Sequence, residues 1–532
     1  MSERSVDWPP YFSELYIHRK LELALDLSLA QVSPALEAEL APRFAAAFAH
    51  MQALESGAIA NPDEGRMVGH YWLRAPELAP NGELGESIRN TREAVATFAR
   101  DVLDQTIRPE RHDRFTDLLC IGIGGSALGP QLLVEALGDA IEMGGLRTHF
   151  LDNTDPEGID RVMAPLLPCL GTTLVVVTSK SGGTPETRNG MLEVAHIFES
   201  YNLALGSQAI AITGRGSKLD SIAREENWLA RFYMEDWVGG RTSLFSAVGL
   251  VPAALAGIDT DAMAQGAAIM DEATRIADLA ENPAARLALA WYAAGDGAGP
   301  RDMVVLPYKD SLLLFSRYLQ QLVMESLGKA TDLDGKPVSQ GIAVYGNKGS
   351  TDQHAYVQQL REGLDNFFAT FLEVLRGRDG DSVTVEHDTT SADYLSGFLH
   401  GTRQALAENG RRSITITVPV VDARRLGALI ALYERAVGLY AHLVNINAYH
   451  QPGVEAGKRA AGERLHLQHS VLAALRGADG AALSLDAIAA AAGSDDLIAV
   501  FQTVRHLDAN RPEVRLSGDP REPASLRVQL TA

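Results

Sequence analysis

The chain has 532 residues, of which 46% are hydrophobic and 22% are charged, a composition that excludes disordered, collagen-like and fibrous proteins. Its 47 Lys and Arg against 68 Asp and Glu give a formal charge of −21, and such an acidic surface repels the backbone of nucleic acids. Only two cysteines, Cys120 and Cys169, are present, which excludes a disulfide framework, and no apolar run approaches the ~20 residues of a membrane span. We therefore expect a cytoplasmic protein whose partners are neither nucleic acid nor a membrane.

The N-terminal part, residues 1–110, is predicted to be mostly helical. Leu21–Ala49 is rich in Leu, Ala and Glu at helix-like spacing, and Thr91–Val102 combines charged and apolar residues in the same way.

In residues 111–300, short apolar runs alternate with helical stretches. Runs of β-branched residues separated by helices are typical of a parallel sheet covered on both faces. We expect a first α/β domain here, with strands at Asp117–Ile123, Thr148–Asp152, Thr173–Thr178 and Gln208–Thr213.

Residues 301–475 show a similar alternation, without a strong internal sequence repeat. The fold class predicted for the chain is therefore α/β, with two parallel-sheet cores. In this second α/β domain the expected strands are Asp302–Leu306, Ser382–Glu386 and Ser413–Val418, and the expected helices are Ser311–Leu327 and Arg424–Asn445.

Residues 476–532 are expected to form a small appendage. A helix from Ser484 to about Gly493, a second helix to about Leu507 and a hairpin over Val514–Val528 resemble part of a winged helix. From Arg476 onward there are six Arg and eight Asp and Glu residues, so we expect packing or assembly rather than DNA binding.

Two glycine-rich turns follow predicted strands. The first, Gly122–Ala127, fits the G-x-G-x-x-A fingerprint of dinucleotide-binding folds, with Asp152 as a candidate acid for the ribose. This turn leaves two interpretations open: a nicotinamide-dependent oxidoreductase, or a tight turn that binds nothing.

The second turn, Ser179–Glu186, carries three hydroxyls, one ammonium group and two glycines. Thr184 is expected to cap the next helix and Pro185 to occupy its first position. Free N–H groups at a helix start, together with hydroxyls, suit a terminal phosphate monoester, whereas a Ser/Gly linker would not need this helix start. Two such turns could hold the two ends of one small phosphorylated molecule, in an enzyme or in a sugar-phosphate sensor.

Four further segments resemble signature segments of the glucose-6-phosphate isomerase family, in the order in which that family has them. They are Gly239–Leu250, Met324–Lys329, Asp352–Tyr356 and Gln451–Lys458. The turn around Ser181 and the stretch Asn347–Thr351 resemble bacterial members. The resemblance implies two sugar-isomerase α/β domains with helical additions, and a homodimer in which the partner subunit supplies a histidine. It also implies cofactor-free, reversible isomerisation of glucose 6-phosphate and fructose 6-phosphate, a step of glycolysis and gluconeogenesis.

The resemblance also implies roles for single residues. Glu325 is expected to move a proton between C2 and C1 through a cis-enediol, and Arg241 to stabilise the enediolate. His354, from across the dimer interface, and Lys458 are expected to act in ring opening. Expected contacts to the sugar or its phosphate are Gly125, Ser126, Ser179, Lys180, Ser181, Thr184, Gln321 and Gln451.

Two further expectations come from residue spacing. Tyr318, Gln321 and Glu325 are spaced to share one helix face, which we expect to line a cleft. Glu386–Asp388 and His466–His469 are the nearest candidates for metal ligands, but each is better interpreted as a polar loop or helix face, so no metal site is expected.

Overall fold

The computed structural model describes residues 8–61, 64–138 and 144–531. The chain folds into two compact units; the first ends at His450 and the second begins at Gln451.

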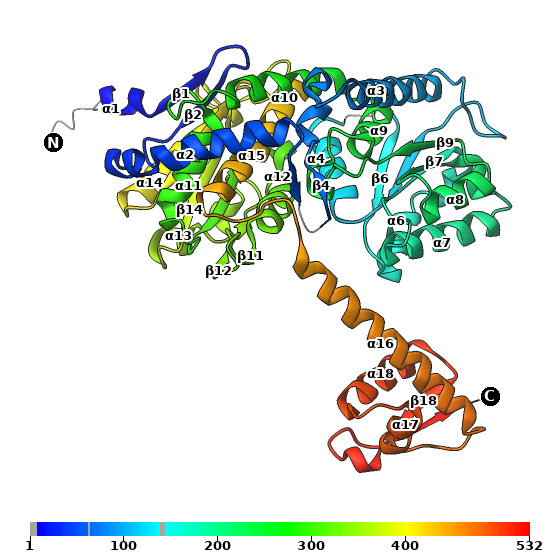
Figure 1. The fold of residues 1–532 in the computed structure, drawn as a ribbon. Coiled ribbons are helices and arrows are strands. Elements are labelled where there is room, and N and C mark those ends of the chain that lie inside the picture. Colours follow the sequence, from blue (N-terminus) through cyan, green and yellow to red (C-terminus); the bar gives the residue numbers. More distant parts are fainter. Residues whose placement is uncertain (1–7, 62–63, 139–143, 532) are drawn as a thin grey trace. The chain divides into compact units, whose positions relative to one another are not determined.

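The first sheet of the first unit is entirely parallel, in the order β6-β5-β7-β8-β9. In β7, Leu174 and Val176 pack toward α3, α4 and α9, whereas Val175 and Val177 pack toward α6, α7 and α8. Figure 1 shows α7 and α8 on one side of this sheet and α3 and α9 on the other. The predicted two-sided parallel sheet is therefore confirmed. Its strands are β5 (Asp117–Ile121), β6 (Arg147–Leu151), β7 (Thr173–Ser179), β8 (Ala209–Thr213) and β9 (Ala230–Tyr233); its helices are α3 (Gly82–Leu103), α4 (Leu128–Leu137), α6 (Pro156–Met163), α7 (Pro185–Ser200), α8 (Lys218–Glu225) and α9 (Ala247–Leu255).

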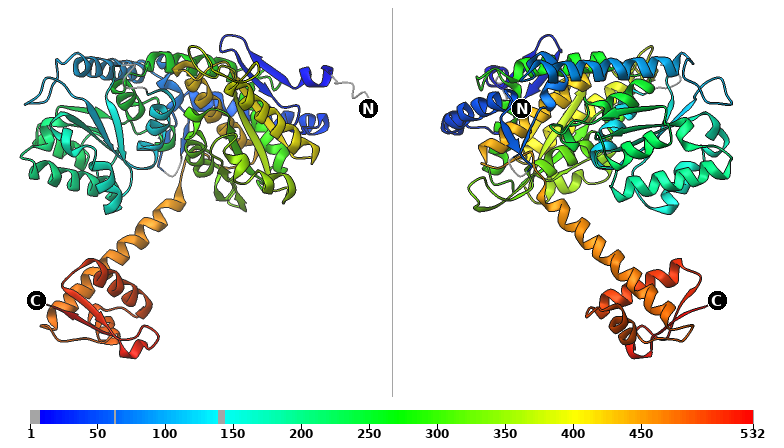
Figure 2. Two further views of the ribbon diagram at one scale, coloured as in Figure 1. Left: turned by 180° about the vertical axis from the view of Figure 1, so that it is seen from behind. Right: turned by 45° about the vertical axis from the view of Figure 1, so that its right-hand side comes forward.

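The second sheet has the order β1-β2-β17-β14-β10-β13. Strands β17, β14, β10 and β13 are parallel, and β2 and β1 extend the sheet in antiparallel fashion. Val304 and Leu306 of β10 face α13 and α14, and Val305 faces the central core. Figure 2 shows the ribbon of this unit from two further sides. The elements are β1 (Leu15–His18), β2 (Leu23–Asp26), β10 (Asp302–Pro307), β13 (Val344–Tyr345), β14 (Phe367–Val374), β17 (Ser413–Val418), α13 (Val357–Glu362) and α14 (Ser391–Glu408).

Long apolar helices complete the core of the first unit. Helix α15 is buried over nearly all of its length, which fits the apolar run predicted at Arg424–Asn445. The remaining elements are α1 (Trp8–Ser13), α2 (Pro34–Glu55), α10 (Thr260–Thr274), α11 (Pro283–Gly295), α12 (Phe315–Leu319) and α15 (Ala423–Leu443), with the short pairs β3 (Ile59–Asn61) and β4 (Arg66–Met67), β11 (Lys329–Thr331) and β12 (Pro337–Gln340), and β15 (Thr384–Glu386) and β16 (Thr389–Thr390).

The helix predicted over Leu21–Ala49 is wrong in nearly its first half. Leu23–Asp26 forms strand β2, and the helix begins only at Pro34, with Ser33 as its N-cap. Leu23 and Leu25 are fully buried where β2 pairs with the edge of β17. Pairing with that edge outweighs the helix preference of the Leu and Ala residues.

A strand of the second sheet was predicted in the wrong place. Ser382–Glu386 contributes only β15 of an exposed hairpin, with Val383 69% and Val385 53% exposed. The sheet instead takes Phe367–Val374 as β14, whose aromatic and aliphatic side chains are buried on both faces. Burial on both faces is the property that a central parallel strand needs.

Five charged side chains form a buried ion cluster that joins the helices of the first unit. Asp271 of α10 accepts from Arg74 Nε at 2.5 Å and from Arg435 Nε of α15 at 3.0 Å. Arg74 also pairs with Glu434, and Arg435 with Glu55 of α2. Burial alone would raise the pKa of Asp271, but the guanidiniums of Arg435 and Arg74 hold it well below its usual range.

The second unit contains the predicted helices and hairpin. Ser484 caps α17, Gly493 ends it in a left-handed conformation, and β18 and β19 pair after α18. In the described residues no single helix is long and apolar enough to cross a membrane. Helices α17 and α18 reach the necessary length and apolar composition only when they are counted together, and they are bent by 104° to each other. The elements are α16 (Pro452–Gly477), α17 (Leu485–Ala492), α18 (Leu497–Asn510), β18 (Val514–Ser517) and β19 (Arg527–Leu530).

Candidate active site

The turn after β5 contacts the segment that carries Arg241. A Cβ at Gly125 would lie only 2.0 Å from the carbonyl oxygen of Gly240, so only glycine fits at position 125. Ser243 Oγ donates to the same Gly240 oxygen at 2.7 Å. This close approach places the 3₁₀ turn η6 (Gly240–Thr242) beside the carboxyl ends of the first sheet's strands.

The guanidinium of Arg241 is buried and held by the second half of the first unit. Its Nε donates to Ser326 Oγ at 2.8 Å, and Nη2 donates to the carbonyls of Ala448 at 2.7 Å and His450 at 3.3 Å. Burial lowers the pKa of Arg241, while the carboxylate of Glu325 raises it. An arginine held in this way presents a fixed positive charge.

Glu325 is the last residue of a π-helical segment, η8 (Gln320–Glu325), that continues α12. Its Oε2 lies 3.4 Å from Arg241 Nη1. This oxygen is buried and accepts no hydrogen bond from the described residues, although the side chain as a whole is 21% exposed. A buried carboxylate oxygen without a donor can accept a proton from a bound molecule.

Gln321 reaches the first glycine turn from the same segment. Its Nε2 lies 3.3 Å from the place that a Cβ at Gly124 would take, and Gly124 has a φ of +60°. The structure therefore brings together Gly125 and Ser126 of the turn, Gln321, Arg241 and Glu325, as the sequence predicted.

The second glycine turn has a locally ordered backbone. Gly182 N donates to Ser179 Oγ at 3.1 Å, and Gly183 N donates to Ser181 Oγ at 3.1 Å. Thr184 occupies the N-cap position of α7 but makes no side-chain capping bond; its hydroxyl accepts instead from Ser179 Oγ at 3.4 Å. The first N–H groups of α7 therefore lack the usual side-chain cap, which leaves them available for an anion.

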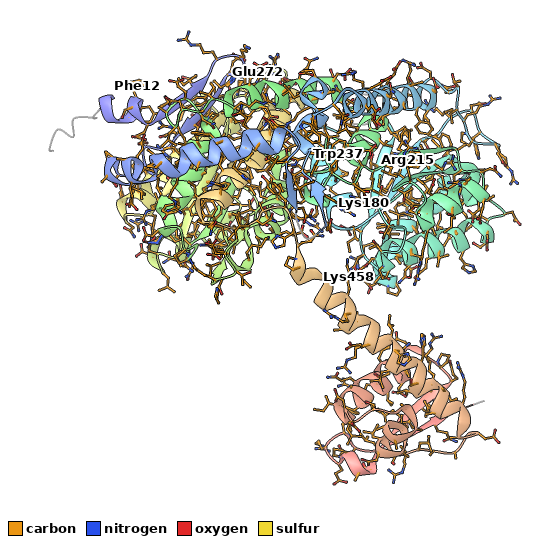
Figure 3. The ribbon with its side chains drawn as sticks, viewed as in Figure 1. Phe12, Lys180, Arg215, Trp237, Glu272 and Lys458 are labelled. Carbon is orange, nitrogen blue, oxygen red and sulfur yellow. The ribbon has the colours of Figure 1, made fainter. Side chains whose placement is uncertain are left out.

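Lys180 links this turn to the Arg241 segment. Its Nζ donates to the carbonyls of Asp236 and Val238, both at 3.2 Å, on either side of Trp237 (Figure 3). Burial and the nearby charge of Arg66 lower the pKa of Lys180. Val238 precedes Arg241 by three residues, which span at most about 11 Å. The Ser179–Thr184 turn is therefore tied through Lys180 to the segment that leads into Arg241.

Of the three remaining catalytic and sugar-contact predictions, one is exposed on a short turn of the first unit and two belong to the second unit. His354 is exposed on η9 (Asp352–His354), and among the described residues no hydrogen bond joins its side chain to Glu325 or Arg241. Gln451 and Lys458 belong to the second unit, where Gln451 precedes α16 and Lys458 lies within it (Figure 3).

Tyr318 does not line the cleft with Gln321 and Glu325, so that expectation is wrong. Its side chain is 3% exposed, its hydroxyl has no hydrogen-bond partner among the described residues, and burial raises its pKa. The cause is the π-helical segment, which has more residues per turn than an α-helix and rotates Glu325 away from the direction of Tyr318.

Two residues of this site carried no prediction. Ser326 anchors Arg241, and Lys329 donates from Nζ to the carbonyls of Glu325 at 2.8 Å and Ser326 at 2.7 Å. Both lie in the signature segment Met324–Lys329, but only the position of the backbone carbonyls reveals what Lys329 does. As for metals, the described residues contain no group of three His, Cys, Asp or Glu side chains that could hold an ion.

Comparisons with known proteins show which family the chain belongs to. The profile of the family described as "Phosphoglucose isomerase" matches residues 39–394 and 361–475. A Nostoc punctiforme relative named glucose-6-phosphate isomerase is 60% identical over 525 residues, covering 98% of this chain and 99% of the relative. The chain belongs to the phosphoglucose isomerase family. A Synechococcus elongatus relative of the same name is 61% identical, covering 98% of each chain.

A solved structure supports the assignment to the phosphoglucose isomerase family. The glucose-6-phosphate isomerase of Chlamydia trachomatis matches with a TM-score of 0.76 and 25% identity, covering 87% of this chain and 91% of that one. The predicted family and the predicted α/β fold are confirmed.

Proposed function

We propose that the protein catalyses the reversible isomerisation of glucose 6-phosphate and fructose 6-phosphate, as in glycolysis and gluconeogenesis. The proposal is supported by one observation above all. The unbonded oxygen of Glu325 lies 3.4 Å from the fixed charge of Arg241, at the same sheet edge as a hydroxyl-rich turn suited to phosphate.

The proposed chemistry assigns each of these groups one task. The Ser179–Thr184 turn and Lys180 bind the phosphate, and Gly125, Ser126, Gln321 and Gln451 contact the substrate. His354 and Lys458 assist ring opening. Glu325 then takes the proton from C2 of the open aldose and returns it to C1, while the proton of the O2 hydroxyl passes to O1 and Arg241 stabilises the enediolate negative charge that develops between these steps.

A coupled assay tests this proposal. Purified protein with a chelator and no added nucleotide should convert each sugar phosphate into the other. Binding of fructose 6-phosphate without turnover would support the sensor interpretation instead. Binding of NAD or NADP at micromolar concentration, without isomerisation, would support the oxidoreductase interpretation of Gly122–Ala127.

Phosphate binding by the Ser179–Thr184 turn, called the phosphate turn below, can be tested at Gly182. Its φ is +65°, and a Cβ there would lie 2.3 Å from the backbone N of Leu219, so Gly182→Ala must displace the turn. We expect KM for fructose 6-phosphate to rise about tenfold or more, which corresponds to about 1.4 kcal/mol of lost binding. Gly183→Ala is the matched control, because a Cβ there meets only Ser181 Oγ, at 3.7 Å. Equal KM values for the two variants would contradict phosphate binding by this turn.

We further propose that the enzyme is a homodimer in which the partner subunit supplies His354. An exposed apolar patch beside His354 supports this. Gln353 Nε2 donates to the carbonyl of Phe398 at 3.2 Å, which ties the histidine segment to α14. Exposed apolar side chains that gather on one face mark interaction surfaces. On α14 the rings of Tyr394 and Phe398 lie 6.1 Å apart. The exposed apolar residues of this part of the chain are Leu375, Val383, Val385, Tyr394 and Phe398, which are 40–69% exposed.

Subunit mixing tests this arrangement. Glu325→Gln and His354→Ala subunits, each inactive alone, are unfolded together and refolded at equal amounts. If His354 acts across the interface, each mixed dimer has one intact site, and activity returns to about a quarter of the wild-type value. If His354 acts within its own chain, every site keeps one lesion and no activity returns.

Two broader parts of the proposal concern domain organisation and location. We propose α/β domains over 111–300 and 301–475, a helical region over 1–110 and an appendage over 476–532. Two separate sheets, one entirely parallel and one with a parallel core of four strands, support the α/β domains. A cytoplasmic location is proposed because that is where the two sugar phosphates are metabolised.

A further inference from the structure

Lys329 is a buried cation without a carboxylate partner among the described residues. It is 5% exposed and begins β11, four residues after Glu325, the last residue of η8. Its Nζ donates to two backbone carbonyls, those of Glu325 at 2.8 Å and Ser326 at 2.7 Å. Burying an ammonium group is costly, so these two bonds are the interactions that must offset the loss of hydration.

The two carbonyls belong to the two residues that organise the proposed reaction centre. Glu325 carries the proposed base, and Ser326 Oγ accepts from Nε of Arg241 at 2.8 Å. At the end of a helical segment the last carbonyls have no partner within the helix, and a nearby cation is one way to satisfy them. Lys329 therefore fixes the backbone from which both the base and the anchor of Arg241 project.

The local fold makes this support necessary. Residues 320–325 form a π-helix, whose wider turn is rare and is found mostly as single turns at functional sites. Burial and the charge of Arg241 lower the pKa of Lys329 to about 8, and Glu325 opposes this shift. The ammonium therefore still predominates at neutral pH and can hold both carbonyls.

We propose that Lys329 is a positioning residue for the isomerisation: by binding the carbonyls of Glu325 and Ser326, it holds the carboxylate and the arginine at their working distance. This inference rests on the proposed function, because it assigns to Lys329 the placement of the proposed base. Lys329 itself does not touch the substrate.

The test is a double-mutant cycle with Glu325. Lys329→Met should lower kcat roughly 10- to 100-fold, because a misplacement of about 1 Å at a catalytic group costs up to 10²-fold. Its dissociation constant for glucitol 6-phosphate, which binds but has no carbonyl to isomerise, should change by less than threefold. In a Glu325→Gln background, Lys329→Met should lower the residual kcat much less than in the wild type, because there only the placement of Arg241, and no longer that of the carboxylate, is disturbed. Lys329→Arg, which keeps the charge and the donors, should recover part of the lost kcat.

Two further measurements separate positioning from general stability and from the proposed function. Lys336→Met is the control, since Lys336 lies on the same hairpin with its side chain 74% exposed. Amide hydrogen exchange over residues 320–328 should rise at least tenfold in Lys329→Met and stay unchanged in Lys336→Met. The same loss of kcat with and without the Glu325→Gln substitution, or unchanged exchange, would overturn the positioning role. A wild-type protein that isomerises neither sugar phosphate would instead contradict the proposed function, and the exchange experiment would still decide whether Lys329 holds this segment.

Discussion

Glu325→Gln is expected to bind fructose 6-phosphate as the wild type does and to turn it over roughly 10²–10⁴-fold more slowly. Glutamine has the shape of glutamate but cannot take a proton from C2, and general base catalysis contributes a factor of this size. The phosphate turn and the contacts of Arg241 to Ser326, Ala448 and His450 do not involve the Glu325 side chain, so substrate binding should persist.

The measurement pairs steady-state kinetics with calorimetric binding of fructose 6-phosphate. Glu39→Gln is a suitable control, because it makes the same change of charge at an exposed position of α2. A Glu325→Gln enzyme that keeps more than a tenth of the wild-type kcat would remove Glu325 from the role of base. A loss of binding instead of turnover would assign the carboxylate to substrate recognition.

Asp271→Ala is expected to lower the free energy of unfolding by about 3–5 kcal/mol, the usual cost of removing one partner from a buried ion pair. Asp271 is the acid between Arg74 and Arg435, and its side chain is completely buried. Without it, two guanidiniums remain close together in the core with less negative charge to offset them. Urea denaturation at pH 7 measures the change.

The control for this variant lies on the same helix. Asp261→Ala removes an exposed pair with Arg92, 2.9 Å long, and should cost no more than about 1 kcal/mol. Because the pKa of Asp271 is lowered in the folded state, its contribution is fully present above the ordinary pKa of an aspartate and is lost as the pH falls toward the folded value. The difference between wild type and Asp271→Ala should therefore shrink below about pH 4. Equal stability of the two proteins at pH 7 would show that the cluster does not hold the helices together.

The fold could be predicted from the sequence where a short apolar run is also buried in the structure. Strands β5, β7 and β8 are uninterrupted apolar runs bounded by turns, and the structure places all three at or near the expected residues. Strand β2 was missed because Leu and Ala favour a helix locally, and only its pairing with β17, almost 400 residues later, decides its conformation. Such long-range pairing leaves no local signal.

Residue types and motif order in the sequence led to the candidate site. The first glycine turn, Gln321, Arg241 and Glu325 lie close together in the structure, and the roles indicated for them stay predictions. The role of Lys329 and the burial of Tyr318 were not predictable, because both depend on the path of the backbone through the π-helical segment. A prediction from residue spacing relies on the regular period of an α-helix, and here the number of residues per turn changes within one turn.

The contact between Gly125 and the Gly240 carbonyl limits which sequences can keep this arrangement. Since any side chain at position 125 would collide with main-chain atoms rather than with a replaceable side chain, no second substitution can make room for it. On the proposed function, selection or protein engineering can therefore adjust substrate preference through Gln321 or the hydroxyls of the Ser179–Thr184 turn, whereas any side chain at position 125 would displace the segment that carries Arg241.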